Sequence, residues 1–177
     1  MTKPLNCSCG GKLKPNTIKD IDLTPLFGIR GTFKEAVLGL RCDTCKAETF
    51  TAQTIEQMLV ALTLVVLSQP RILTAKEARY LRKAVLSLTQ AALAKRMGIN
   101  VITIADWERG ERPLSKEHDY ELRGITLANL LERPSTLNFY FDAVKQNIAH
   151  ILMSPRVTAP PKRVKNYVVK ALVKPAA

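Results

Sequence analysis

The chain has 177 residues, which is enough for one ordinary domain or two small ones. Hydrophobic residues make up 46% and charged residues 24%, a globular composition that excludes a largely disordered chain. The net charge of +12 favours an anionic partner such as nucleic acid. The sequence shows no phosphate-binding glycine loop, metalloprotease pair or nucleophile beside a histidine, so we expect a protein that is not an enzyme.

The N-terminal residues lack the apolar segment of a secretory signal. The longest apolar run, 58–67, is interrupted by Thr63 and is too short to span a bilayer. We therefore expect a cytoplasmic location, association with the nucleoid and no membrane partner.

Residues 1–68 are predicted to form a small α+β domain with a connecting helix. Residues 17–22 and 28–41 have the composition of strands, with glycine and proline between them. A helix is predicted over 54–67, where Thr54 is the expected N-cap and Gln57 completes a capping-box pattern. This helix is apolar almost all round, which fits either a central core helix or a helix that also packs on a partner chain.

Four cysteines lie in two clusters within this first domain. Cys7 and Cys9 are separated by one residue, and Cys42 and Cys45 by two, as in a zinc knuckle. Four thiolates complete the tetrahedral coordination of Zn²⁺ and leave no open position, so a bound zinc would be structural. The alternative is four reduced, buried cysteines. If zinc binds, loss of any one cysteine is expected to unfold residues 1–50.

Residues 72–134 carry capping signals of several short helices. Thr74 and Glu77 form a capping box, Thr89 caps a second helix that Gly98 ends, and Asn100 caps a third helix over 101–108. One or two closing helices are expected over 115–131. Two short helices around a glycine-bearing turn are typical of a helix-turn-helix, whose second helix enters the major groove of DNA.

One run of residues closely resembles the Xre family of phage-repressor-like helix-turn-helix domains. The resemblance covers about 74–131 and rests on the string Leu88-Thr89-Gln90-x-x-Leu93-Ala94-x-x-Met97-Gly98-Ile99-x-x-x-Thr103-Ile104-x-x-Trp107-Glu108-Arg109-Gly110. It implies a mainly α fold, a lambda-repressor-like helical bundle that follows the N-terminal α+β zinc domain. It also implies DNA contacts: Gln90, Arg109 and Arg112 to the backbone, and Val101, Ile102 and Asp106 on the outward face of the recognition helix.

The chemistry of that outward face restricts what it reads. Val101 and Ile102 cannot hydrogen-bond a base but can contact thymine methyl groups. Asp106 either accepts from a cytosine amino group or pairs with a nearby arginine. Asn100 and Thr103 are alternative polar readers.

The last stretch, 135–177, is predicted as a helix over 137–153 followed by a basic tail. Residues 136–177 hold seven Lys and Arg but one acidic residue. Residues 154–177 fit either a disordered basic arm or a segment that becomes ordered on a protein partner. A short strand or helix is predicted within it, over 167–173.

The order of a four-cysteine domain, a connecting helix and an Xre-type domain resembles the MqsA family of antitoxins and related regulators. The resemblance implies a zinc domain that binds a toxin protein and a homodimeric repressor that binds the palindromic operator of its own operon. Two features depart from that family: the shorter first cysteine pair and the extra C-terminal residues. A free-standing Xre-type regulator without a toxin, or a protein-interaction adaptor on the same fold, remains an alternative.

Overall fold

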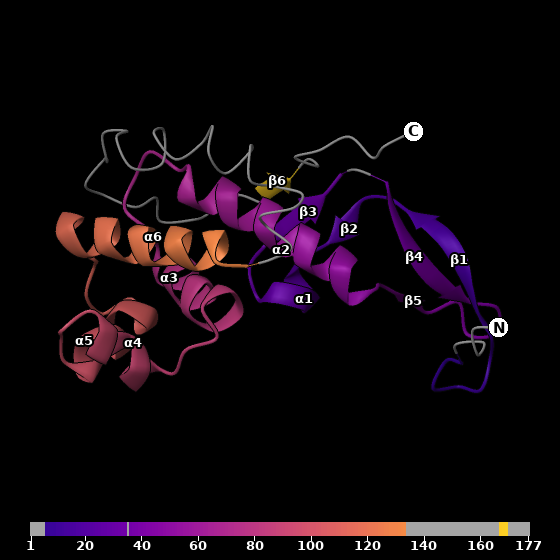
Figure 1. Ribbon diagram of the computed structural model, residues 1–177, viewed down its shortest axis with the longest axis horizontal. Helices are drawn as coiled ribbons and strands as arrows, with labels where there is room; N and C mark the ends of the chain where they lie inside the picture. Colours follow the sequence, from indigo (N-terminus) through magenta and orange to yellow (C-terminus); the bar gives the residue numbers. More distant parts are fainter. Residues whose placement is uncertain (1–5, 35, 134–166, 170–177) are drawn as a thin grey trace.

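The computed structural model describes residues 6–34, 36–133 and 167–169. It confirms the predicted class: a small β-sheet region at the N-terminus, followed by a mainly helical part. Figure 1 shows β1 (Leu13–Ile18) and β4 (Val37–Cys42) toward one end of the long axis and α4 (Gln90–Arg96) and α5 (Val101–Arg109) at the other, with α2 (Ala52–Leu67) between them. The predicted helix over 137–153 and most of the basic tail lie outside the described residues.

Two three-stranded sheets form the N-terminal part. The first has the order β1-β4-β5, in which β1 (Leu13–Ile18), β4 (Val37–Cys42) and β5 (Glu48–Thr49) are antiparallel neighbours. The second has the order β2-β3-β6, in which β2 (Ile21–Asp22) is antiparallel to β3 (Gly31–Phe33) and β6 (Tyr167–Val169) is parallel to it.

The predicted strand boundaries need correction. The expected strand 17–22 is broken at Asp20, whose φ of 52° bends the chain between β1 and β2. The expected strand 28–41 is two strands, β3 and β4, which belong to different sheets. A short helix, α1 (Thr24–Phe27), was not predicted; it begins with Pro25 in its first turn.

Helix α2 (Ala52–Leu67) is the centre of the core. Its N-cap is Thr51, whose hydroxyl accepts from the Thr54 amide at 3.1 Å, so the prediction of Thr54 as the cap was wrong. Burial within the chain itself explains why this helix is apolar almost all round. Val60, Leu64 and Leu67, which lie off its main apolar face, are as buried as the residues on that face. One continuous core includes Leu23 and Phe33 from the sheets, α2, and the helices that follow.

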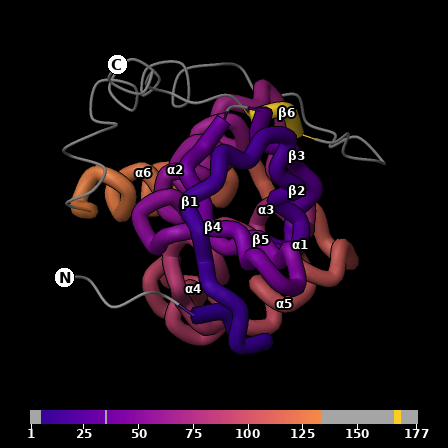
Figure 2. The backbone as a smooth tube through the Cα atoms, turned by 90° about the vertical axis from the view of Figure 1, so that its right-hand side faces the viewer, coloured from indigo at the N-terminus to yellow at the C-terminus, as the bar shows by residue number. Residues whose placement is uncertain are grey.

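The helical part contains α3 (Ala75–Tyr80), one π-helical turn (Leu81–Val85), α4 (Gln90–Arg96), α5 (Val101–Arg109) and α6 (Lys116–Leu131). The capping box of Thr74 and Glu77 and the caps Thr89 and Asn100 are confirmed. Gly98 has a φ of 63°, the left-handed conformation expected after α4. Figure 2, viewed at right angles to Figure 1, shows α2 and α6 above α4 and α5.

Among the described residues, no helix combines the length and the apolar character needed to cross a bilayer.

Candidate metal centre and nucleic-acid interface

The four cysteines come together from two turns. Cys7 and Cys9 lie in a turn closed by the Cys7 amide, which donates to the Gly11 carbonyl at 2.8 Å. Cys42 ends β4, and Cys45 lies in the turn that leads to β5. Backbone and side-chain bonds between Lys12 and Asp43, each 3.0 Å long, hold the two turns side by side. These bonds bring together two turns that are about thirty residues apart in the sequence.

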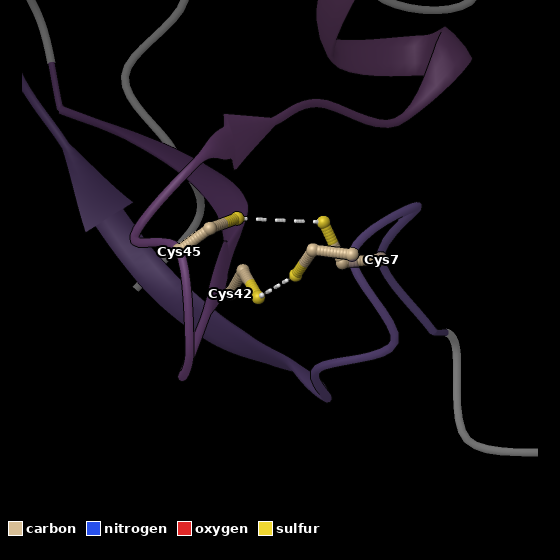
Figure 3. Close-up of side chains that lie close together, drawn as sticks. Cys7, Cys42 and Cys45 are labelled. Atoms are coloured by element: carbon tan, nitrogen blue, oxygen red, sulfur yellow. Dashed lines mark hydrogen bonds between the residues drawn. The ribbon is translucent and has the colours of Figure 1, made fainter.

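The sulfur atoms are placed as a four-coordinate ion requires. The Cys7 and Cys45 Sγ atoms are 3.7 Å apart, the Cys9 and Cys42 Sγ atoms are 3.4 Å apart, and all four lie within 4.8 Å of one another (Figure 3). Zn–S bonds of about 2.3 Å in a tetrahedron correspond to sulfur separations of about 3.8 Å. The short first pair is therefore compatible with the geometry, and the cluster can hold a metal ion.

Gly11 allows this close approach. A Cβ at Gly11 would lie 2.6 Å from the Cys42 Sγ and 2.6 Å from the Thr44 Oγ1, closer than real contacts permit. Only glycine lets the first turn come this near to the second. The glycine therefore leaves space for the sulfur atoms of the two turns to come together.

The thiols do not ionise equally. The backbone N–H of Cys45 donates to the Cys42 sulfur and, although burial opposes it, lowers the pKa of Cys42 to about 6. At Cys45 the Ala47 N–H lowers the pKa, but the surrounding thiols Cys9, Cys42 and Cys7 raise it to about 12. A cluster of four thiolates therefore needs a cation for charge balance.

A second candidate site lies on α4 and α5, the elements predicted to meet DNA. Val101 and Ile102, at the start of α5, are 42% and 63% exposed. Asn100 is occupied as the cap of this helix, since its side chain accepts from the Ile102 amide at 2.9 Å. Thr103 is half-buried. The exposed end of α5 is thus mainly apolar.

Arg109, predicted to contact phosphate, is engaged by two acidic residues. Its guanidinium bonds Asp106 at 2.5 Å and Glu111 at 2.8 Å, and this contact lowers the pKa of Glu111. Arg109 is the last residue of α5, so it precedes the loop that leads from α5 to α6. Arg112 is exposed in that loop. Asp106 is seen paired with a nearby arginine, one of the two arrangements expected for it.

Gln90 belongs to a network that joins α4 to the helix before it. Its amide donates to Glu108 at 2.9 Å, and Glu108 accepts from Arg82 at 2.6 and 2.8 Å. Burial alone would raise the pKa of Glu108, but the Arg82 hydrogen bonds outweigh it and hold that pKa below its ordinary value. Arg82 also donates to the Leu88 carbonyl at 2.7 Å, so the turn before α4 is fixed. The network sets the position of Gln90.

A groove beside α4 and α5 is lined by Arg79 and Lys83, two cations that the sequence did not single out. Thr89, Gln90 and Arg109 border it as well. Arg79 and Lys83 are exposed, and within the described part of the chain no carboxylate forms an ion pair with either. Their spacing of four residues would have placed them on one helical face, opposite the apolar positions. The groove thus has two available cations beside α4.

Comparison with known proteins identifies the helical part. A family model described as helix-turn-helix, of the Xre type, matches residues 79–118. Proteins of this type are typically DNA-binding regulators, so the predicted Xre-type helix-turn-helix is confirmed. No curated protein and no solved structure matches the chain. The match does not extend to the cysteine domain, so the resemblance to MqsA-like antitoxins stays a prediction.

Proposed function

We propose that the protein is a zinc-containing transcriptional repressor that binds a palindromic operator as a homodimer. The observation that carries the proposal is the combination of an exposed apolar start of α5 with a groove along α4 and α5, where Arg79 and Lys83 form no ion pair with a carboxylate of the described residues. Exposed apolar side chains on a recognition helix can contact the methyl groups of thymine in the major groove. The flanking cations would hold the phosphate backbone.

We assign contact with the DNA backbone to the groove beside α4. Arg79 and Lys83 supply positive charge at one wall, and Gln90 supplies an amide whose position Glu108 fixes at 2.9 Å. Arg109 would have to leave Asp106 and Glu111 before it could bind a phosphate at full strength. We therefore propose Arg79 and Lys83 as the principal phosphate contacts of this face.

Base readout is assigned to the first turn of α5. Val101 and Ile102 project there with 42% and 63% of their surface exposed. Asn100 and Thr103 are the neighbouring polar candidates, while Asp106 is turned toward Arg109. Readout dominated by methyl contacts favours A·T-rich half-sites.

The metal is proposed to be Zn²⁺ in a structural role. Four cysteine sulfurs form the candidate donor set, and four-thiolate sites leave no position for a substrate. In this role the ion replaces a hydrophobic core for the β1-β4-β5 sheet, in which Ile18, Gly39 and Cys42 are the buried residues. The cysteine domain then serves as a rigid module for a protein contact.

We further propose that the repressor is the antitoxin of a toxin–antitoxin pair. This role is supported by the order of the modules, in which the cysteine domain precedes α2 and the helix-turn-helix. A toxin partner would bind the cysteine domain and leave α5 free for DNA. Co-purification of a small protein encoded by a neighbouring gene would separate this role from that of a free-standing regulator.

The proposed function is tested by selection from random DNA duplexes with the full-length protein. We expect enrichment of a palindrome whose half-sites lie about one helical turn apart and carry T at the steps facing α5. Affinity for the selected duplex should exceed that for scrambled DNA by at least about a thousandfold. Equal affinity for both duplexes would reject the repressor and leave the adaptor alternative.

Replacement of Lys83 by alanine is expected to weaken binding to all duplexes alike. Loss of one phosphate contact should reduce the slope of log K against log salt by about one. Lys76→Ala is the matched control, because Lys76 is an exposed lysine of α3, the helix that the π-helical turn of Lys83 continues, and it does not line the groove. The measurement is fluorescence anisotropy over a salt series. The assignment fails if both variants change the slope equally.

A further inference from the structure

The C-terminal segment returns to the sheet as β6. It pairs in parallel with β3, where Tyr167 lies opposite Gly31 and Val169 opposite Phe33. The Lys34 amide donates to the Val169 carbonyl at 3.0 Å, and the Tyr167 amide donates to the Arg30 carbonyl at 3.3 Å. In Figure 1 this short strand lies beside β3 and close to α2. A segment remote in sequence thus completes the sheet.

The side chains of β6 alternate as in a strand with one buried face. Tyr167 and Val169 are 7% and 0% exposed, whereas Val168 is 56% exposed. Gly31 lies opposite Tyr167, and the backbones are close enough that a Cβ at Gly31 would be in ordinary van der Waals contact with the Tyr167 Cβ at 3.5 Å. One face of β6 is therefore buried in the core.

The hydroxyl of Tyr167 reaches the start of the helix-turn-helix. It donates to the carboxylate of Glu77, and Arg71 donates to the tyrosine oxygen at 3.1 Å. Glu77 is fully buried and forms a bidentate pair with Arg71 at 2.7 and 2.8 Å. The same carboxylate accepts from the Thr74 amide at 2.7 Å, closing the capping box of α3. Tyr167 is therefore a partner of the group that caps α3.

The orientation of α3 matters for the proposed DNA contacts. Arg79 lies on α3, Lys83 lies in the π-helical turn that continues it, and α3 packs against α5. A change in the start of α3 would move the groove cations relative to the recognition helix. We infer that Tyr167 is a positioning residue for DNA binding, which acts through Glu77 and fixes α3 to the sheet. This inference rests on the proposed function.

The test is the variant Tyr167→Phe in the full-length chain, which removes the hydroxyl and keeps the buried ring. We expect affinity for the selected duplex to fall by about threefold or more with an unchanged salt slope, because fewer molecules hold the competent arrangement but no phosphate contact is lost. Hydrogen exchange at the amides of Glu77 and Ala78 should become faster. Val168→Ala, on the exposed face of the same strand, should leave both readouts unchanged.

A double-mutant cycle with Glu77→Gln separates positioning from a general loss of stability. If Tyr167 acts through Glu77, adding Tyr167→Phe to Glu77→Gln should weaken DNA binding less than it does in the wild type. Additive losses, or Tyr167→Phe binding and exchanging like the wild type, would overturn the inference. Emission of Trp107, the single tryptophan and buried in α5, identifies the temperature range in which every variant is folded. Exchange at α3 needs no DNA, so failure of the proposed function alone would leave this readout interpretable.

Discussion

Replacement of Cys42 by serine is expected to abolish tight zinc binding and to unfold the cysteine-bearing sheet. Three thiolates would remain, and the sulfur that is lost accepts the Cys45 N–H bond, which lowers the pKa of Cys42 to about 6 and favours its thiolate. The sheet β1-β4-β5 has few buried side chains to compensate, so loss of the ion removes most of its stability. Structural zinc in small domains contributes about 10 kcal/mol or more of apparent folding free energy at neutral pH.

The measurement is zinc content per chain together with hydrogen exchange over 6–49. We expect about one zinc in the wild type, and in the variant both loss of the metal and fast exchange in that sheet. Ser8→Ala is the matched control, since Ser8 lies between Cys7 and Cys9 but supplies no sulfur. Trp107 emission should stay that of a buried indole, because Trp107 lies in α5, at the end of the molecule opposite β1 and β4 (Figure 1). A Cys42→Ser protein that retains zinc and slow exchange would contradict the four-cysteine site.

Replacement of Arg123 by methionine is expected to cost about 3–5 kcal/mol of unfolding free energy. Arg123 and Asp119 are a fully buried ion pair on α6, with Nε 2.8 Å from the carboxylate. The guanidinium also donates to the carbonyl of Leu67 at the end of α2 and to that of Arg71 at 2.8 Å. Without it, the buried Asp119 carboxylate keeps the Leu73 amide at 2.8 Å but loses its ion-pair partner, and the Leu67 carbonyl at the end of α2 loses a donor.

Denaturant unfolding followed by far-UV circular dichroism measures this loss. Lys116→Met, an exposed site on the same helix, should change the stability by less than about 0.5 kcal/mol. The double variant Asp119→Leu/Arg123→Met should lose less than the two single changes added together, because no buried charge is left unpaired. A loss below about 1 kcal/mol for Arg123→Met would show that the pair does not hold α2 and α6 together.

Features that depend on residues close in sequence were predicted well. The Thr74 and Glu77 box, the Thr89 and Asn100 caps and the turn at Gly98 involve partners within a few residues, so the local pattern carries the information. The misplaced cap of α2 shows where this is insufficient. Both Thr51 and Thr54 can cap, and the structure has the Thr54 hydroxyl within 3.3 Å of the Leu38 carbonyl on β4.

Features that depend on distant residues were partly or wholly missed. The break between β3 and β4 assigns them to different sheets, which periodicity along one run cannot indicate. Arg79 and Lys83 line one groove with residues of α4 and α5, and this arrangement depends on how the helices pack, which the local pattern does not indicate. The ion pairs of Arg109 arise from the fold of its exit turn, and they change its expected share in phosphate binding.

The sequence by itself determined the helix-turn-helix and the two cysteine pairs, because short-range caps, helical spacing and thiol chemistry are written in neighbouring residues. Only the tertiary structure decided that the four sulfurs meet, that Arg123 joins α2 to α6, and that Tyr167 reaches Glu77 from the C-terminal segment. Such contacts are selected by packing and by the need to satisfy buried polar groups, and these conditions exist only once remote segments share a core.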